Sequence, residues 1–117
     1  MRALLLLLLL SPGPALADED SPGRQVDFGL KVAQKGLWQE ARFRFERAVQ
    51  LDAHNAAAFN DLAVALEQMG EFDGARKAYE KALELKPGDL YVQQNYDLFR
   101  EADDKRNRKS RKKAAHP

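Results

Sequence analysis

At 117 residues, the chain has room for one small domain. It contains no cysteine, which excludes disulfide bonds and thiol catalysis and leaves packing to stabilise the fold. Its 19 basic and 18 acidic residues nearly balance, but residues 18–104 hold all 18 acidic and 11 basic ones, whereas residues 105–117 hold seven basic and no acidic ones. The chain is therefore an acidic body followed by a basic tail.

The first 17 residues have the layout of a secretory signal peptide. Arg2 supplies a short positive region, residues 3–10 form an apolar run, and residues 15–17 read Ala-Leu-Ala, an A-x-A cleavage site. The run is too short to span a bilayer, which needs about 20 apolar residues. We therefore expect cleavage before Asp18 and an exported protein, periplasmic in a Gram-negative bacterium and secreted otherwise.

Five helices are predicted after a polar lead-in, residues 18–23, that Pro22 and Gly23 make flexible. Apolar residues at helical spacing place them at residues 24–35, 39–51, 56–69, 73–86 and 90–106. Residues 107–117 are polar and basic and are predicted to form a disordered tail.

The ends of these helices carry recognisable signals. Gly36 and Gly70 follow the first and third helices, where glycine takes up the left-handed conformation that ends a helix. Asn55, Asp73 and Asp89 precede the third, fourth and fifth helices and are candidate N-caps. Short connections between the helices are therefore expected.

Residues 22–89 repeat after 34 positions. Sliding the chain by 34 superposes eight identical pairs, where chance would give about two. These pairs are Asp27/Asp61, Gln34/Gln68, Gly36/Gly70, Ala41/Ala75, Arg42/Arg76, Glu46/Glu80, Ala48/Ala82 and Leu51/Leu85. This period is typical of stacked helical hairpins, which mostly bind other proteins. The small residues Ala41, Ala48, Ala75 and Ala82 are expected where helices cross or hairpins stack.

The small and aromatic residues resemble the pattern of the tetratricopeptide repeat family. The second unit, residues 56–89, carries most of it: Phe59, Leu62, Ala63, Leu66, Gly70, Phe72, Ala75, Tyr79, Ala82 and Pro87. The first unit, residues 24–55, matches at Phe28, Gly29, Val32, Gly36, Trp38, Ala41, Phe45 and Ala48. It departs at Gln25, where an aromatic residue is usual, and at Ala53, where proline is usual.

The resemblance implies an all-α fold, a right-handed stack of two helical hairpins closed by a capping helix at residues 90–106. Asp97 and Arg100 stand in that helix where Ala63 and Leu66 stand in the unit before. Because polar residues there disfavour packing of a further helix, the array is expected to end at this helix. We expect a monomer or a weak homodimer.

Ligands of this family usually lie in a concave groove lined by the first helix of each hairpin. The resemblance places ten residues of this chain there: Val26, Leu30, Gln34, Asn60, Val64, Glu67, Gln68, Tyr91, Gln94 and Leu98. Some members clamp a peptide's C-terminal carboxylate with basic residues, but the corresponding positions here are Asp27, Asn60, Asp61 and Gln94. We therefore expect a neutral, apolar or mildly basic protein or peptide. The alternative is that these residues only pad the contacts between helices.

The basic tail is the second candidate site, for phosphate, an anionic membrane surface or an acidic protein. Its basic residues are Lys105, Arg106, Arg108, Lys109, Arg111, Lys112 and Lys113. No aromatic residue interleaves them, so nucleic acid is not expected. The alternatives are a solubilising terminus, or a tail that folds back on the acidic body.

Catalysis has little support in the sequence. His54 lies in a predicted turn and His116 in the tail, so no histidine pair suggests a metal or a proton relay. Asp103 and Asp104 are expected at a solvated helix end. We therefore expect no metal, no cofactor and no enzymatic activity, and favour an interaction adaptor over a protein tethered to a surface through its tail.

Overall fold

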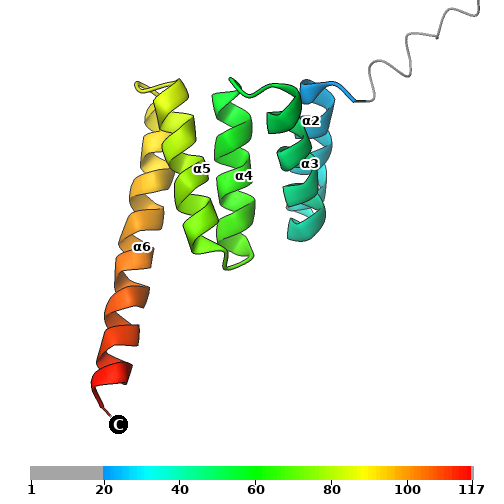
Figure 1. The fold of residues 1–117 in the computed structure, drawn as a ribbon. Helices are drawn as coiled ribbons and strands as arrows, with labels where there is room; N and C mark the ends of the chain where they lie inside the picture. Colours follow the sequence, from blue (N-terminus) through cyan, green and yellow to red (C-terminus); the bar gives the residue numbers. More distant parts are fainter. Residues whose placement is uncertain (1–19, 117) are drawn as a thin grey trace, which may run out of the picture.

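The computed structural model describes residues 20–116, which form five α-helices and no strand. The helices are α2 (Pro22–Gln34), α3 (Trp38–Leu51), α4 (Ala56–Gln68), α5 (Phe72–Leu85) and α6 (Leu90–Ala115). Figure 1 shows them side by side, α2 with α3 and α4 with α5 as hairpins, followed by α6. The predicted all-α stack of two hairpins and a closing helix is confirmed.

Most of the predicted helix ends are found in the structure. Gly36 and Gly70 have φ of 75° and 76°, a left-handed conformation that glycine adopts without strain. The Asn55 side chain caps α4 by accepting a hydrogen bond of 3.0 Å from the amide of Ala58. Asp89 caps α6 in the same way. Backbone chemistry at these positions therefore sets where the hairpins turn.

The predicted N-cap of the fourth helix and the predicted start of the first helix are wrong. α5 begins at Phe72 and its N-cap is Glu71, which makes no side-chain capping bond, so Asp73 lies inside the helix. α2 begins at Pro22, inside the predicted flexible lead-in, because proline at the first helical position loses no needed hydrogen bond. Ser21 caps this helix by accepting from the amide of Arg24 at 3.2 Å. Residues 1–19, with the predicted signal peptide, lie outside the described residues.

The core between the helices depends on small residues. The four alanines at the predicted crossing points are fully buried: Ala41, Ala48, Ala75 and Ala82. Their size lets helix backbones approach closely. Gly29 has the same role in α2, because a Cβ there would lie 2.5 Å from Cε1 of the buried Phe45 ring.

Aromatic rings join α6 to the second hairpin. The ring centroid of Tyr79 in α5 lies 5.4 Å from that of Phe99 and 5.8 Å from that of Tyr96, both in α6. Tyr79 and Phe99 are almost fully buried. Asp97 and Arg100 are exposed, as expected of a helix that ends the array.

The prediction that the last helix ends at Arg106 and that a disordered tail follows is wrong. α6 has 26 residues and continues to Ala115, and Figure 1 shows its end projecting beyond the other helices. Residues 107–115 contain no glycine or proline and are mostly lysine, arginine and alanine, which favour helix. Basic residues in the last turn also interact favourably with the helix dipole.

Asp103 is buried, with 6% of its surface exposed, and is not at a solvated helix end as expected. Its carboxylate forms ion pairs with Arg76 of α5 and with Arg106, one turn further along α6, at 3.2 Å. The Arg106 guanidinium also lies 3.5 Å from the ring centroid of Phe72. This cluster fixes α6 against α5 and removes Arg106 from the predicted anion-binding set.

Candidate functional site

Side chains from α2, α4 and α6 meet around a hollow of about 250 Å³, which we call the groove hollow. Its lining residues are Leu30, Ala33, Gln34, Trp38, Phe45, Asp61, Val64 and Tyr91. Four of these residues are among the ten predicted from the resemblance: Leu30, Gln34, Val64 and Tyr91. The structure therefore brings together residues from three helices that are far apart in the sequence.

Helical periodicity places these side chains on the same side of each helix. Leu30, Ala33 and Gln34 are three and four residues apart in α2, and Asp61 and Val64 are three apart in α4. Tyr91 comes from the first turn of α6, just after the Asp89 cap. Trp38 and Phe45 of α3 complete the lining.

Asn60 has a different role from the one predicted. It is 2% exposed, and its Oδ1 accepts a hydrogen bond of 3.2 Å from Nδ2 of Asn95 in α6. A buried amide needs such a partner. Asn60 therefore holds α4 to α6 and does not present its side chain to a ligand.

The other predicted groove residues do not line the groove hollow. Glu67 accepts a hydrogen bond of 2.9 Å from the Tyr79 hydroxyl and so connects α4 with α5. Val26 is half-buried, whereas the remaining three are exposed elsewhere on their helices: Gln68, Gln94 and Leu98. A partner could therefore reach Gln68, Gln94 and Leu98, but outside the groove hollow.

Asp61 is a lining residue outside the ten predicted groove residues, although the resemblance placed it at a position of the carboxylate clamp. Burial raises the pKa of its carboxyl group from 3.8 to about 6, against a smaller lowering by a hydrogen bond with the Asn60 side chain. Within residues 20–116, no ion pair includes Asp61. Its spacing of three from Val64 is the sequence signal that would have placed it in the groove.

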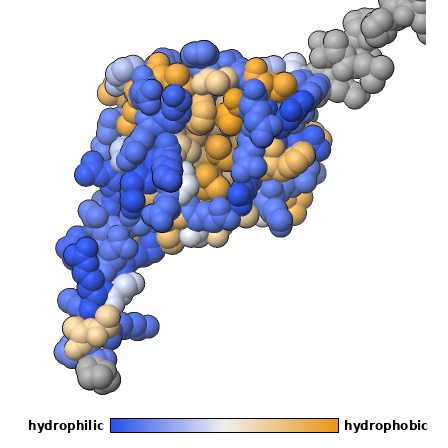
Figure 2. All heavy atoms as spheres, viewed as in Figure 1, coloured by the Kyte–Doolittle hydropathy of each residue, from blue (hydrophilic) through white to orange (hydrophobic). Residues whose placement is uncertain are grey.

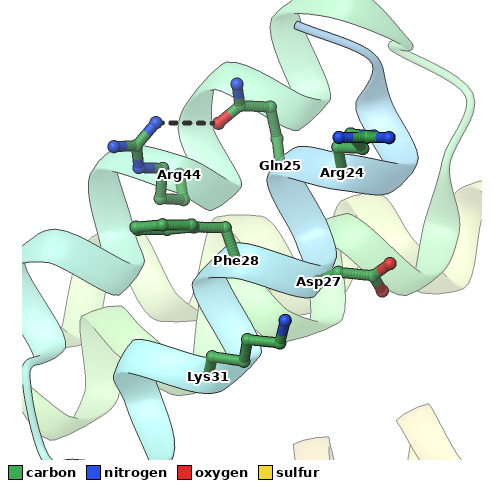
Figure 3. A pocket seen from close by; sticks show the side chains of 6 residues that line it. All are labelled: Arg24, Gln25, Asp27, Phe28, Lys31 and Arg44. Carbon is green, nitrogen blue, oxygen red and sulfur yellow. Dashed lines mark hydrogen bonds between the residues drawn. The ribbon is translucent and has the colours of Figure 1, made fainter. Parts of the chain in front are cut away.

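A second hollow, of about 610 Å³, lies on the outer side of the first hairpin, and sequence reasoning did not indicate it. Figure 3 shows its six lining residues, Arg24, Gln25, Asp27, Phe28, Lys31 and Arg44. Arg44 lies over the half-exposed Phe28, 4.2 Å from the ring centroid, and donates to Oε1 of Gln25 at 3.5 Å. Three basic side chains and one aspartate make this site polar, in contrast to the groove hollow.

The projecting part of α6 carries the basic residues predicted to bind anions. All except Arg106 are exposed: Lys105, Arg108, Lys109, Arg111, Lys112 and Lys113. Lys105 pairs with Glu101 at 3.1 Å. On the face that Figure 2 shows, apolar residues gather over the body, whereas the end of α6 is mostly hydrophilic.

Residues 20–116 provide neither a metal site nor a membrane-spanning helix. This part of the chain holds no group of three histidine, cysteine, aspartate or glutamate side chains placed to bind a metal ion. None of its helices combines the length and the apolar character needed to cross a membrane.

Comparisons with known proteins agree with this architecture. Residues 33–94, more than half of the chain, match the model of a family described as tetratricopeptide repeat. Two crystal structures of MamA are similar to the chain, with TM-scores of 0.69 and 0.70 and sequence identities of 29% and 28%. The matches cover 80% and 87% of this chain but only 51% and 66% of the MamA chains.

A third solved structure is the second tetratricopeptide repeat domain of human RPAP3, determined by NMR in complex with the HSP70 peptide SGPTIEEVD. Its TM-score is 0.68 at 20% identity, over 73% of this chain and 71% of that one. At this identity the likeness concerns the fold alone. With its 34-residue period, its stacked hairpins and the family match, the chain belongs to the tetratricopeptide repeat family.

Proposed function

We propose that the chain is an exported, non-enzymatic adaptor that binds a segment of another protein along the face formed by α2, α4 and α6. The observation that carries this proposal is the groove hollow, to which three helices contribute side chains that the core leaves accessible. Concave, mostly apolar sites with a few polar groups are the usual form of a binding site.

Exposure argues against the alternative that these residues only pad the contacts between helices. Leu30 is 42% exposed and Tyr91 is 66% exposed. Apolar side chains that served packing alone would be removed from water, because each such burial stabilises the fold by about 1.5–3 kcal/mol. Accessible apolar side chains around a hollow are instead typical of a surface that a partner covers.

Family membership supports the same proposal. Tetratricopeptide repeat domains bind protein and peptide partners, as the RPAP3 domain does in its complex with an HSP70 peptide. That peptide ends in Glu-Glu-Val-Asp and is acidic, whereas Asp61 gives the groove hollow a carboxylate of its own. We therefore propose a partner segment of different charge for this chain.

Binding at the groove hollow is tested by truncating exposed residues that line it. Tyr91→Ala and Leu30→Ala remove contact area from the groove hollow without disturbing buried residues. Leu90→Ala is the matched control, because Leu90 is 83% exposed and does not line the groove hollow. In affinity capture from cells that produce the protein, we expect partners recovered with the wild type and Leu90→Ala to be lost with the double variant. Equal recovery by all three proteins would rule out the groove.

Export is tested separately by sequencing the N-terminus of the protein isolated from its producing cells. The A-x-A motif at residues 15–17 predicts that the mature chain begins at Asp18. A mature chain that retains Met1 in the cytoplasmic fraction would contradict export and leave the binding proposal standing.

A second candidate function is binding of an anionic membrane surface through the projecting end of α6. The observation in its favour is that this end is helical, exposed and basic. A helix that the Asp103 cluster fixes to the body would present these positive charges away from the acidic body of the chain.

Vesicle sedimentation distinguishes this candidate. A chain that ends after Arg106 keeps the Asp103 cluster and loses the five basic residues beyond it. If the helix binds membranes, the full chain should sediment with phosphatidylserine vesicles at low salt and be released above about 0.1 M salt, where screening is strong. Phosphatidylcholine vesicles are the control, and equal sedimentation of the shortened chain would exclude the candidate.

A further inference from the structure

We propose that the groove hollow receives a lysine or arginine side chain of the bound segment, and that the Asp61 carboxylate pairs with it. This inference rests on the proposed function and specifies the chemistry of the partner. It follows from three observations, which concern the charge of the groove hollow, its size and its walls.

The first observation is that Asp61 has no cationic partner within the described part of the chain. Two other carboxylates that contact a neighbouring element are ion-paired, since Asp103 pairs with two arginines and Asp20 pairs with Arg47. Asp61 is half-buried, and the group that hydrogen-bonds its carboxylate is the neutral amide side chain of Asn60. Removing a carboxylate from water without a counter-charge is unfavourable, so a group that persists there is a candidate for function.

Asp61 also has no evident structural role. It lies in the sixth position of α4, inside the helix, where it is too far from the N-terminus to cap it. The cap is supplied by Asn55, and the contact with α6 is supplied by Asn60. An aspartate in a helix interior is unfavourable relative to alanine, so the fold does not require this residue.

The second observation is the size of the groove hollow. At about 250 Å³, it lies below the range of about 300–1,000 Å³ that is usual for sites of small molecules and cofactors. It suits one long side chain of a segment whose backbone lies on the surface. The exposed fraction of Leu30 and Tyr91 leaves apolar area on either side for that segment.

The third observation is the chemistry of the walls. Leu30, Val64 and Phe45 are apolar and would contact the methylene groups of a lysine or arginine stem. Trp38 and Tyr91 are aromatic, and aromatic faces attract ammonium and guanidinium groups. With Asp61 among its lining residues, the groove hollow offers an apolar wall, aromatic rings and a carboxylate to a long basic side chain.

Selection from a library of random peptides displayed on phage tests the inference with the purified full chain. Three proteins are screened in parallel: the wild type, Asp61→Asn, and Asp73→Asn as a control. Asp73→Asn makes the same change of net charge at a side chain that is 93% exposed on α5. We expect the wild type and the control to select peptides with lysine or arginine at one fixed position between apolar residues. Asp61→Asn should select apolar peptides without that basic residue.

The outcomes separate this inference from the proposed function. If the wild type selects peptides that Tyr91→Ala no longer binds but that lack a common basic residue, the groove binds peptides and the inference is wrong. The same basic residue selected by Asp61→Asn would also overturn it. If no peptide is enriched on the wild type, the proposed function itself fails.

A quantitative test follows with one selected lysine peptide and its norleucine analogue, which keeps the aliphatic stem of the lysine side chain and lacks its ammonium group. For the wild type, the analogue should bind about tenfold more weakly, as expected for loss of a charge-assisted hydrogen bond in a partly buried site. For Asp61→Asn, the two peptides should bind within about twofold of each other. An equal loss in both proteins would show that Asp61 does not contact the basic group.

Discussion

Asp61 places one partly buried carboxyl group in the lining of the groove hollow. When ionised, this group gives the groove hollow a negative charge and lowers the stability of the fold. Burial among the walls of the groove hollow raises its pKa to about 6, which favours the neutral form in the folded protein. Tyr91 is the only other titratable side chain among those walls. Among the walls of the groove hollow, Asp61 is therefore the position through which the stability of the fold should depend on pH near neutrality.

The sign of this dependence follows from the raised pKa. The stabilising effect of a neutral Asp61 is fully present below pH 3.8 and is lost as the pH rises through about 6. At pH 7, Asp61→Asn should therefore be more stable than the wild type by about 1 kcal/mol, a value reduced from the full shift because the group keeps some contact with water. Near pH 4 the two proteins should differ little. Urea unfolding followed by circular dichroism at both pH values measures this, and a variant less stable at pH 7 would contradict it.

Gly29 is a second residue at which one atom decides the packing. A methyl group there would lie 2.5 Å from Cε1 and 2.8 Å from Cδ1 of the buried Phe45 ring, so the ring or the helix would have to shift. Gly29→Ala should destabilise the fold by about 1–3 kcal/mol, although alanine favours helix. Gly23→Ala is the control in the same helix, with nothing within 4 Å of the added atom, and should be neutral or stabilising. Thermal unfolding of both variants gives the comparison, and equal midpoints would exclude the clash.

At the scale of the elements, α6 differs most from what the sequence suggested. Its first half packs on α5 through aromatic rings and the Asp103 cluster, whereas residues 107–115 are exposed on all sides. The prediction of a disordered tail relied on the polar, basic composition of these residues and did not consider their helix propensity. A helix that already exists up to Arg106 needs no new nucleus, so each further residue adds at low cost.

Ser110→Pro tests whether this end of α6 is helical. Proline in a helix interior removes a hydrogen bond and clashes with the preceding turn. The variant should therefore lose helical ellipticity at 222 nm, a standard helix band, while the thermal midpoint of the body stays unchanged because Ser110 is exposed. Ser110→Ala is the control and should keep the signal. Unchanged ellipticity in the proline variant would favour the disordered tail.

At the scale of the whole molecule, two hairpins and one closing helix form a short array. Arrays of this kind are stabilised by contacts between neighbours, and about three stacked units are needed to close a core. α6 supplies the third surface, since it covers the ring of Tyr79 and the face of α5 around it. The array is therefore expected to depend on α6 for its cooperativity.

Shortening the chain tests this dependence. A chain that ends at residue 89 lacks α6 and exposes Tyr79, which is 1% exposed in the complete fold. We expect it to unfold at a much lower temperature, without a cooperative transition. A chain that ends at residue 106 keeps Phe99 and the Asp103 cluster and should unfold close to the full chain. Similar cooperative melting of both shortened chains would show that two hairpins suffice.

The sequence by itself determined the hairpins, most of their turns and four of the residues that line the groove hollow. These features depend on local rules, because glycine at Gly36 and Gly70 and the apolar spacing act within one or two helical turns. The 34-residue period repeats the same local signals in the second hairpin. The extension of α6 also lay within reach of such rules, since residues 107–115 contain no helix breaker.

Only the tertiary structure decided which polar residues face a neighbouring helix and which face the groove hollow. Asn60 and Asp61 are adjacent in α4, yet one is buried against Asn95 and the other lines the groove hollow. Successive residues of a helix point about 100° apart, so the distinction depends on where α6 lies. The same holds for Asp103, whose burial follows from the position of Arg76 in α5. Charge partners between helices are set by packing geometry, which no local pattern encodes.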